Sequence, residues 1–355
     1  MSERDKSSQA QAVSWLKATG PENDVVVSSR IRLARNLSNY PFGVRLSAEQ
    51  RKDLIADVAR AVSGSSFLKK VELLFTREIG EIDRQFLLER HLVSNELIHD
   101  EGISAVAITP DEMVSLMVVE EDHLRLQVFQ SGLNLVEAWR IADEIDTALE
   151  KNLKYAFDAM LGYLTACPTN VGTGLRASCM LHLPSLVLTK QIQKVLQALS
   201  KLNLAVRGLY GEGTQALGNY FQFSNQITLG QPEAEIISNL EGVIKQVITH
   251  EREAREYLRK KRKTKMEDQV WRALGALKSA RLISSQEAIQ LLSLVQAGID
   301  IGILNGQVTH RDLNQLFLWI QPGHLQKMNG GELSAAERDA RRAERIRGYF
   351  SKVVL

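Results

Sequence analysis

Five arginines of this chain stand where they could bind an anion together. Arg30 and Arg32 are two residues apart in the segment SSRIRLAR, so their side chains leave the same face of a strand. Arg125 lies on the polar side of another alternating segment, and Arg176 and Arg207 each adjoin a glycine-rich turn. Two arginines on a strand are more often a solvated face, but glycine turns at strand ends let ligands approach the backbone. Because a guanidinium fork matches phosphate oxygens and stays charged, the set predicts phosphate binding.

Two acids and one thiol supply the second half of the predicted chemistry. Glu121 is the middle residue of an acidic turn, EED, and Glu212 lies in a glycine-rich loop. Each could simply be an exposed turn residue. Together they offer carboxylates from two segments that could hold a planar guanidinium by paired hydrogen bonds and accept its proton. A guanidinium needs such a base because its pKa is above about 12. Cys167, in a turn before a proline, is either an inert thiol or a thiolate stabilised by arginines.

Several common nucleotide and metal motifs are absent from the sequence. The chain has no P-loop, no HRD and DFG pair and no H-E-x-x-H zinc motif. A bound nucleotide would therefore depend on side chains such as arginine. The formal net charge of +2 does not demand a polynucleotide partner. The basic run at 259–265 has acidic neighbours and no interleaved aromatic residues, which favours a charged helix face over direct nucleic-acid binding.

The composition predicts a soluble protein of the cytoplasm. Hydrophobic residues make up 44% of the chain and charged residues 24%, as in ordinary globular proteins. The polar N-terminus has no secretory signal, and no apolar stretch is long enough to span a membrane. Cys167 and Cys179 are the only cysteines, which indicates a reducing compartment, and Cys179 is predicted to be a buried thiol.

Strands and helices are both predicted in the first part of the chain, and only helices in the last part. Alternating segments indicate strands, and apolar spacings of three and four indicate helices. Two strands separated only by the acidic turn predict a hairpin and an antiparallel sheet. The apolar spacing breaks near the basic run 259–265, where we place a domain boundary. The fold class is therefore α+β, with a small all-helical domain over 265–355. Strands are predicted at 25–37, 103–109, 113–119, 123–130, 176–184, 204–209 and 220–224, and helices at 48–63, 81–98, 134–161, 188–201 and from 233 onward.

Four segments of the chain, in the same order, resemble the phosphagen (guanidino) kinases. They are SSRIRLARN at 28–36, EEDHLRL at 120–126, CPTNVGTGLRAS at 167–178, and RGLYGEG at 207–213 ahead of NYFQFSN. The resemblance covers about residues 24–255 and implies a catalytic domain of that extent, with an antiparallel sheet flanked by helices. It also implies ATP as the phosphoryl donor and Mg²⁺ that bridges the ATP phosphates.

The resemblance further implies roles for individual residues. Glu121 and Glu212 would be the guanidinium-binding and base carboxylates, and Cys167 the reactive cysteine of the family. His91 would lie against the adenine. No residue is implied as a metal ligand. The residues implied in ATP binding are Val27, Ser28, Ser29, Arg30, Ile31, Arg32, His91, Arg125, Arg176, Ala177, Ser178, Cys179, Met180, Arg207, Gly208, Leu209, Tyr210, Gly211 and Glu212.

Three departures from the family pattern are informative. Met180 stands where the family has a second adenine-side histidine, and Gln222 where it has an acid near the ribose, so nucleotide affinity and base selectivity can differ. Family members that act on free guanidino compounds carry a helical domain before the SSR segment, which closes over the small substrate. Here that segment starts at Ser28, so we expect an open site that admits arginine on a protein surface.

The C-terminal helix carries a second candidate site. Ser334 and Glu337 form a capping box that opens a helix in which Arg338, Arg342 and Arg345 share one face. On spacing alone, a solvated face balanced by acids is the more common arrangement. The segment is also similar to the RDxxRA motif of the bacterial protein-arginine kinases, which implies phosphoarginine binding, dimerisation and allosteric activation. The matching residues are Arg338, Asp339, Arg342 and Ala343.

The sequence thus predicts a kinase that transfers the γ-phosphoryl group of MgATP to arginine residues of proteins. A kinase for a small guanidino metabolite and a non-catalytic phosphoarginine-binding adaptor are the two alternatives. The resemblance implies partners as well: protein substrates with exposed arginines, an activator protein, a Clp-type unfoldase and protease, and a second copy in a homodimer. It also implies a role in protein quality control and the stress response.

Overall fold

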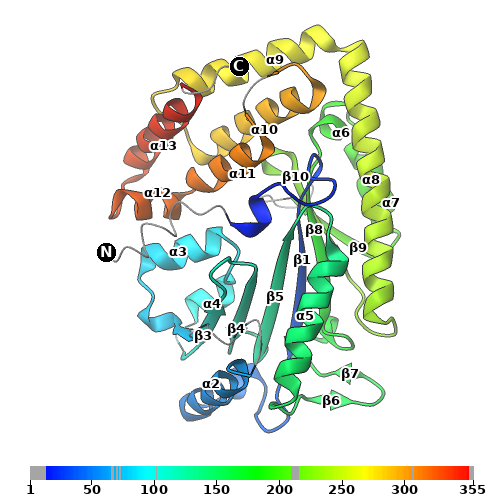
Figure 1. Ribbon diagram of the computed structural model, residues 1–355, viewed down its shortest axis with the longest axis vertical. Coiled ribbons are helices and arrows are strands. Elements are labelled where there is room, and N and C mark those ends of the chain that lie inside the picture. The colour runs from blue at the N-terminus through cyan, green and yellow to red at the C-terminus, as the bar shows by residue number, and fades with distance from the viewer. Residues whose placement is uncertain are drawn as a thin grey trace.

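The computed structural model describes residues 13–64, 68, 71, 73–100, 102–208, 216–305 and 308–351. Its centre is an eight-stranded sheet in the order β2-β3-β4-β5-β1-β8-β10-β9, in which every neighbouring pair is antiparallel (Figure 1). The predicted α+β class is confirmed. The strands are β1 (Val26–Arg35), β2 (Leu73–Phe75), β3 (Ala105–Ile108), β4 (Val114–Val118), β5 (Leu124–Ser131), β8 (Leu175–His182), β9 (Leu204–Gly208) and β10 (Tyr220–Asn225).

Helices flank the sheet and then continue alone to the C-terminus. Figure 1 shows α5 lying along β1 and β5, and α8 rising beside the sheet toward the helices of the C-terminal region. The helices are α2 (Ala48–Val62), α3 (Glu81–Glu89), α4 (Asn95–His99), α5 (Leu135–Glu150), α6 (Pro184–Leu188), α7 (Ile192–Ser200), α8 (Glu233–Lys261), α9 (Lys263–Ser279), α10 (Ser285–Ile301), α11 (His310–Trp319), α12 (Pro322–Asn329) and α13 (Ala335–Phe350). Within the described residues, none of these helices is long and apolar enough to cross a membrane.

The side chains of the central strand β1 alternate between the hydrophobic core and the opposite face of the sheet. Ile31 and Leu33 are fully buried and share one hydrophobic cluster with Ile141 and Ile145 of α5. The alternate residues of β1 leave the opposite face because successive side chains of a strand point to opposite sides. The face of the sheet away from α5 is therefore free to carry polar chemistry.

Two hydrophobic clusters account for most of the interior. One joins the sheet to α2, α5 and α8, and its last member along the chain is Ala254. The other joins α9 to α13 with a short N-terminal 3₁₀ helix, η1 (Ser14–Leu16), and includes Leu258 of α8. The change from one cluster to the other lies near Arg262, where α8 ends and α9 begins.

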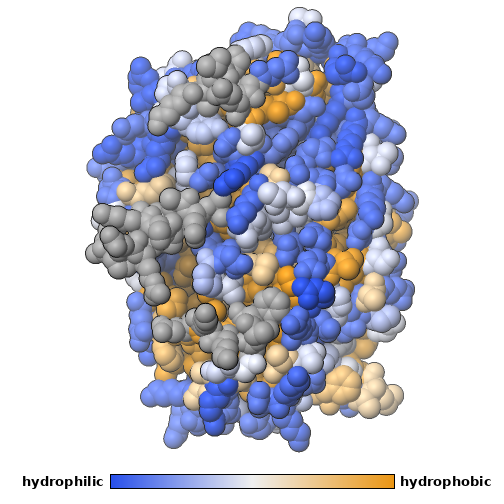
Figure 2. Space-filling view, in the orientation of Figure 1, coloured by the Kyte–Doolittle hydropathy of each residue, from blue (hydrophilic) through white to orange (hydrophobic). Residues whose placement is uncertain are grey.

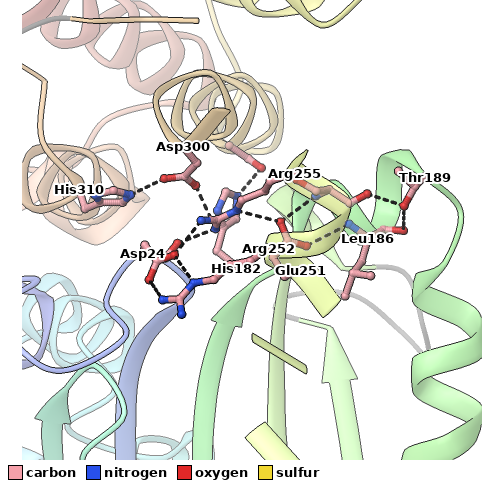
Figure 3. A network of polar contacts seen from close by, with 11 residues as sticks. Asp24, His182, Leu186, Thr189, Glu251, Arg252, Arg255, Asp300 and His310 are labelled. Carbon is pink, nitrogen blue, oxygen red and sulfur yellow. Dashed lines mark hydrogen bonds and ion pairs between the residues drawn. The ribbon is translucent and has the colours of Figure 1, made fainter. Parts of the chain in front are cut away.

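A network of charged side chains joins α8 to both clusters (Figure 3). Arg255 of α8 is nearly buried, and its guanidinium lies 2.8 Å from a carboxylate oxygen of Asp24 and 3.2 Å from one of Asp300. Glu251, one turn earlier, accepts backbone hydrogen bonds of 3.0 Å at the start of α6. His310 lies 2.7 Å from Asp300. Each buried charge in this network therefore has an opposite charge or a backbone donor beside it.

The helix predicted over 134–161 ends earlier, at Glu150. Residues after Glu150 find backbone partners outside the helix: Ala156 N donates to Asn36 O at 2.7 Å, and Leu164 N donates to Ala156 O. Between them, β6 (Phe157–Asp158) and β7 (Gly162–Tyr163) form a small hairpin. Phe157, Met160 and Leu161 of this hairpin are exposed, and Figure 2 shows hydrophobic residues at the lower right of an otherwise mostly hydrophilic face. Tertiary hydrogen bonds have replaced the helical ones.

Two more predicted helices are interrupted. The segment 81–98 forms α3 and α4, separated where His91 has a φ of 59° and where Ser94 caps α4 by accepting a hydrogen bond from Leu97 N. The segment 188–201 forms only α7, which starts at Ile192 after Lys190 with a φ of 61°. A left-handed residue cannot continue an α-helix, so periodicity alone overestimated both lengths.

Candidate active site

Four of the five predicted arginines line one cavity of about 240 Å³ on the face of the sheet opposite α5. Arg32 of β1 stands directly opposite Arg176 of β8 in the antiparallel register. Arg125 comes from β5, the strand on the other side of β1, and Arg207 from the edge strand β9. Gly174 makes room at the start of β8, because a Cβ there would lie 2.6 Å from the carbonyl oxygen of Ala34. The sheet thus brings together residues that are far apart in the sequence.

The arginines of this cavity are poorly neutralised. Nε of Arg32 and Nε of Arg176 are buried, and neither has a hydrogen-bond partner among the residues that the structure describes. Burial, together with Arg30, Arg125 and Arg176, lowers the pKa of Arg32 well below its usual value. Burial and the nearby charges of Arg207 and Arg125 also lower the pKa of Arg176. A group of partly buried like charges with unpaired Nε donors is the arrangement expected of a site that binds a polyanion.

Arg125 is the exception, because it has an anionic partner. Its guanidinium pairs with the carboxylate of Glu120, whose side chain is almost fully buried. The predicted hairpin is confirmed: Val119 and Glu120 lead from β4 into the acidic turn, and β4 and β5 are antiparallel neighbours. The ion pair holds Arg125 beside the acidic turn, and Arg125 still lines the cavity.

A second, much smaller compartment adjoins Arg30. It has a volume of only about 20 Å³ and lies between β1, β5, β8 and β10. Arg30 lies over the ring of Phe129 at 5.6 Å, and burial with Arg125 and Arg176 lowers the pKa of Arg30 to about 10. The compartment is lined by Trp15, Ser28, Arg30, His91, Phe129, Ser178, Met180 and Gln222. The two positions that depart from the family pattern, Met180 and Gln222, are therefore neighbours here.

Trp15 closes this compartment. Its side chain is 2% exposed, stacks on Phe129 at 5.7 Å between ring centroids, and lies 5.8 Å from the ring of His91. Burial, with Arg30 and Arg32 nearby, lowers the pKa of His91 to about 4, so His91 is neutral at physiological pH. A space of this size holds about one water molecule. A larger occupant requires Trp15 or a neighbouring side chain to move.

Glu121 and Cys167 lie at the same cavity as the arginines. Burial raises the pKa of Glu121, and the charges of Asp122 and Glu120 add to that effect while Arg125 opposes it. Cys167 is half-buried, and its Sγ lies 3.0 Å from the hydroxyl of Thr169. A carboxyl with a raised pKa is a stronger base than an ordinary glutamate.

Asp122 joins the loops that carry these two residues. Its buried carboxylate accepts hydrogen bonds of 2.6 Å from Asn36 Nδ2 and from Ala166 N, the residue before Cys167. Asn36 in turn accepts a hydrogen bond from His123 N at 2.9 Å. Sequence reasoning did not single out Asn36 or this use of Asp122. Their only signal was a position within the segments SSRIRLARN and EEDHLRL.

The second predicted acid cannot be placed. Glu212 and its neighbours Leu209, Tyr210 and Gly211 lie outside the described residues. Gly208 is described and ends β9. The pairing of Glu121 with Glu212 therefore stays a prediction.

Several residues of the implied ATP-binding segments point away from the cavities. Cys179 is buried in the core, and burial raises the pKa of its thiol to about 12, as expected of an inert cysteine. Ser29 donates a hydrogen bond of 2.8 Å to the Gly132 carbonyl on the same side of the sheet. Ile31 and Ala177 are likewise buried in the cluster that packs against α5, whereas Val27, next to a register shift in β1, is buried with Trp15 and Phe129. Strand alternation explains this division, because only every second residue of β1 and β8 can face a ligand with its side chain.

The C-terminal motif is divided in a similar way. The predicted capping box is present, and Arg338 lines a cavity of about 860 Å³ between α3, α4, α12 and α13. Arg342 is instead buried, and its guanidinium donates to the carbonyls of Ile320 and Ile283 at 2.7 and 2.8 Å and to Asp339 at 2.5 Å. Ala343 is buried beside it. Arg342 therefore needs no external anion to offset its charge.

Two family models match consecutive parts of this chain. The model of the ATP:guanido phosphotransferase C-terminal catalytic domain matches residues 53–254, and that of the protein-arginine kinase McsB C-terminal domain matches residues 263–354. A protein-arginine kinase of Moorella thermoacetica is 52% identical over 94% of this chain and 96% of its own length. One from Symbiobacterium thermophilum is 50% identical over 95% and 96%.

A solved structure has a similar fold over a large part of this chain. The duplicated taurocyamine kinase of Schistosoma mansoni, with transition-state-analogue components, is similar with a TM-score of 0.60 and 25% identity. The match covers 71% of this chain but only 36% of that longer one.

Proposed function

Because the chain belongs to the ATP:guanido phosphotransferase family, we propose that it transfers the γ-phosphoryl group of ATP to the guanidinium of arginine side chains in proteins. The convergence of Arg32, Arg125, Arg176 and Glu121 on one small cavity is the observation that carries the proposal. Curated relatives that align over nearly the whole chain are named protein-arginine kinases, which supports protein arginine as the acceptor.

The buried guanidinium groups would bind the triphosphate. Arg32 and Arg176 have free buried Nε donors, and Arg207 adds a charge from the sheet edge. Charge develops on the phosphoryl oxygens as the bond to the leaving phosphate lengthens, so fixed cations stabilise that state without reorganisation. The adenine would lie toward His91 after Trp15 moves, which agrees with the position of their compartment beside Arg30.

Mg²⁺ fits this arrangement as an ion carried on the ATP phosphates. No group of three His, Cys, Asp or Glu side chains in the described part of the chain is placed to hold a metal. We therefore assign no side chain to the ion, because Mg²⁺ at phosphates commonly keeps water and phosphate oxygens as ligands. When bound, it would reduce the negative charge that the arginines must offset.

Glu121 would orient and help to deprotonate the acceptor, with Glu212 as its proposed partner. The attacking guanidinium nitrogen gives a proton to a carboxylate and forms a bond to the γ-phosphorus. The bond from that phosphorus to the β,γ-bridging oxygen breaks, and ADP leaves. Cys167, beside the same cavity, would favour the charged guanidinium during binding.

The acceptor is tested directly. The enzyme is incubated with ATP and either free arginine or an arginine-rich protein, and phosphoarginine is measured by mass spectrometry under non-acidic conditions. We expect rapid modification of the protein and slow modification of free arginine. Faster turnover of free arginine would favour a kinase for a small guanidino metabolite. Absence of acid-labile phosphate on any protein would favour a binding adaptor.

The catalytic carboxylate has a test of its own. Glu212→Ala is expected to abolish transfer while nucleotide binding is largely retained. Retained transfer would remove Glu212 from this role.

The broader predictions rest on the sequence patterns and on the resemblance to the family. They are a catalytic domain over 24–255, a helical domain over 265–355, a homodimer, an activator protein, marking of proteins for a Clp-type protease, a role in stress and a cytoplasmic location. Phosphoarginine binding at the C-terminal helix is also proposed here. It is supported by Arg338 at its cavity, while Arg342 and Asp339 would hold the helix in place.

A further inference from the structure

A larger cavity opens beyond the phosphoryl-transfer site. Its volume is about 910 Å³, against about 240 Å³ for the inner cavity, and Glu121 and Arg125 line both. The inner cavity has room for reacting groups. The volume of the outer cavity is in the range of cavities that bind whole ligands. The two cavities meet at Glu121, the carboxylate that would hold the acceptor.

We propose that the outer cavity binds the polypeptide segment around the target arginine, and that Glu96 selects segments with a second basic residue nearby. The inference rests on the proposed function and names the class of substrate. It concerns residues outside the phosphate-binding arginines and the catalytic acids.

One wall of the outer cavity is preformed. Phe42 stands edge-on to the ring of His123 at 6.1 Å, and His123 Nε2 lies 2.9 Å from the carbonyl oxygen of Pro41. Gly43 packs so closely that a Cβ there would lie 2.6 Å from the carbonyl oxygen of Glu121. A wall held this firmly against the catalytic turn offers a bound chain a fixed surface, which reduces the cost of ordering on binding.

The charge of Glu96 gives one part of the outer cavity a preference for a cationic flank. Two pairs of the lining are neutralised internally, Arg51 with Asp100 and Arg125 with Glu120, and the remaining charged side chains are Glu121, Glu96 and the exposed Arg45. Glu96 is exposed in the first turn of α4, and its side chain has no hydrogen-bond or ion-pair partner among the described residues. Glu96 also acts on the catalytic turn, since its charge contributes to raising the pKa of Glu121. A lysine or arginine of the substrate beside Glu96 would gain an ion pair and offset that repulsion.

Peptide kinetics test the proposal. Three peptides of equal length carry one target arginine, with lysine, alanine or glutamate two residues away. For the wild type we expect kcat/KM to fall in that order, by about two- to five-fold per step, the effect of an exposed ion pair. Raising the ionic strength should compress the differences because salt screens exposed charges.

Substitutions at one residue then assign the selection. Glu96→Gln should flatten the order, and Glu96→Lys should reverse it, when kcat/KM of each peptide is divided by that of the alanine peptide for the same variant. Asp143→Lys is the matched control: Asp143 is exposed on α5, which covers the opposite face of the sheet, so the wild-type order should remain.

The outcomes separate the two levels of the argument. Equal rates for the three peptides, or an unchanged order in Glu96→Lys, would overturn the role of Glu96 while leaving arginine phosphorylation intact. If free arginine is modified and none of the peptides is, protein arginine itself is the wrong acceptor and both proposals fall.

Discussion

Two buried groups of arginines in this molecule are treated in opposite ways. On the sheet, Arg32 and Arg176 face each other with unpaired Nε donors, and burial together with neighbouring arginines lowers the pKa of each. At α8, Arg255 is surrounded by Asp24, Glu251 and Asp300 (Figure 3). A buried charge costs free energy unless it is paired. Arg255 is paired within the chain, whereas Arg32 and Arg176 would be paired only by a bound anion. Unpaired burial therefore marks the site, and paired burial marks the scaffold.

Removing a site arginine should give the largest effect of these variants. It should lower kcat without lowering the stability of the fold. Arg176→Met deletes a cation that faces the phosphates, so we expect kcat to fall by about 10³-fold or more. The melting temperature should stay the same or rise, because the substitution relieves repulsion from Arg207 and Arg125. Steady-state kinetics and thermal unfolding measure both.

The control is Arg140→Met, on the exposed side of α5, where Arg140 pairs with Glu137 and Glu144. It should leave kcat unchanged. A marked loss of stability in Arg176→Met with retained activity would show that Arg176 is a scaffold residue and would break the comparison.

Removing an arginine of the charged network at α8 should instead lower the free energy of unfolding. Arg255→Ala leaves Glu251 buried without its cation and Asp300 with His310 alone, and we expect the free energy of unfolding to drop by about 3–5 kcal/mol. Arg252→Ala, one turn away in sequence but 46% exposed at the side chain, should cost about 1 kcal/mol or less. Urea unfolding gives both values. An equal loss of unfolding free energy in the two variants would mean that burial does not determine how much these ion pairs stabilise the fold.

The pKa of His91 should report the unpaired cations. Burial with Arg30 and Arg32 lowers the pKa of His91 from 6.5 to about 4, so between these values the unfolded chain binds more protons. Stability from this group is therefore present above pH 6.5 and is lost as the pH falls toward 4. We expect inorganic tripolyphosphate to raise the pKa of His91 by screening the arginines.

Nuclear magnetic resonance of the histidine rings measures that shift. His123 is the internal control, because burial lowers its pKa without an arginine among the causes. Its pKa should not respond to tripolyphosphate. An unchanged pKa for His91 would place the phosphates away from Arg30.

The smallest expected signal is optical. The compartment beside His91 is too small for a nucleotide base, so ADP binding should displace Trp15 and change its fluorescence. The change should disappear in Trp15→Phe and persist in Trp271→Phe, because Trp271 is an exposed residue of α9. A change that persists without Trp15 would show that the base enters elsewhere.

Much of the fold was predictable because local periodicity is strong. The hairpin around the EED turn, the start of α2 and the capping box of α13 all follow from short patterns. The predicted helix over 134–161 was wrong after Glu150, because hydrogen bonds to the distant segment around Asn36 replaced helical ones. Such partners cannot be read from local spacing.

The sequence by itself determined which residue types were available for phosphate binding and which face of each strand they occupy. Residue type sets the charge of a guanidinium, and strand alternation sets its side. Only the tertiary structure decided that Arg32 faces Arg176 across two strands, that Arg342 is satisfied by carbonyls, and that Trp15 closes a compartment. Those facts depend on strand order and long-range packing, which place atoms from distant segments within a few ångströms of one another.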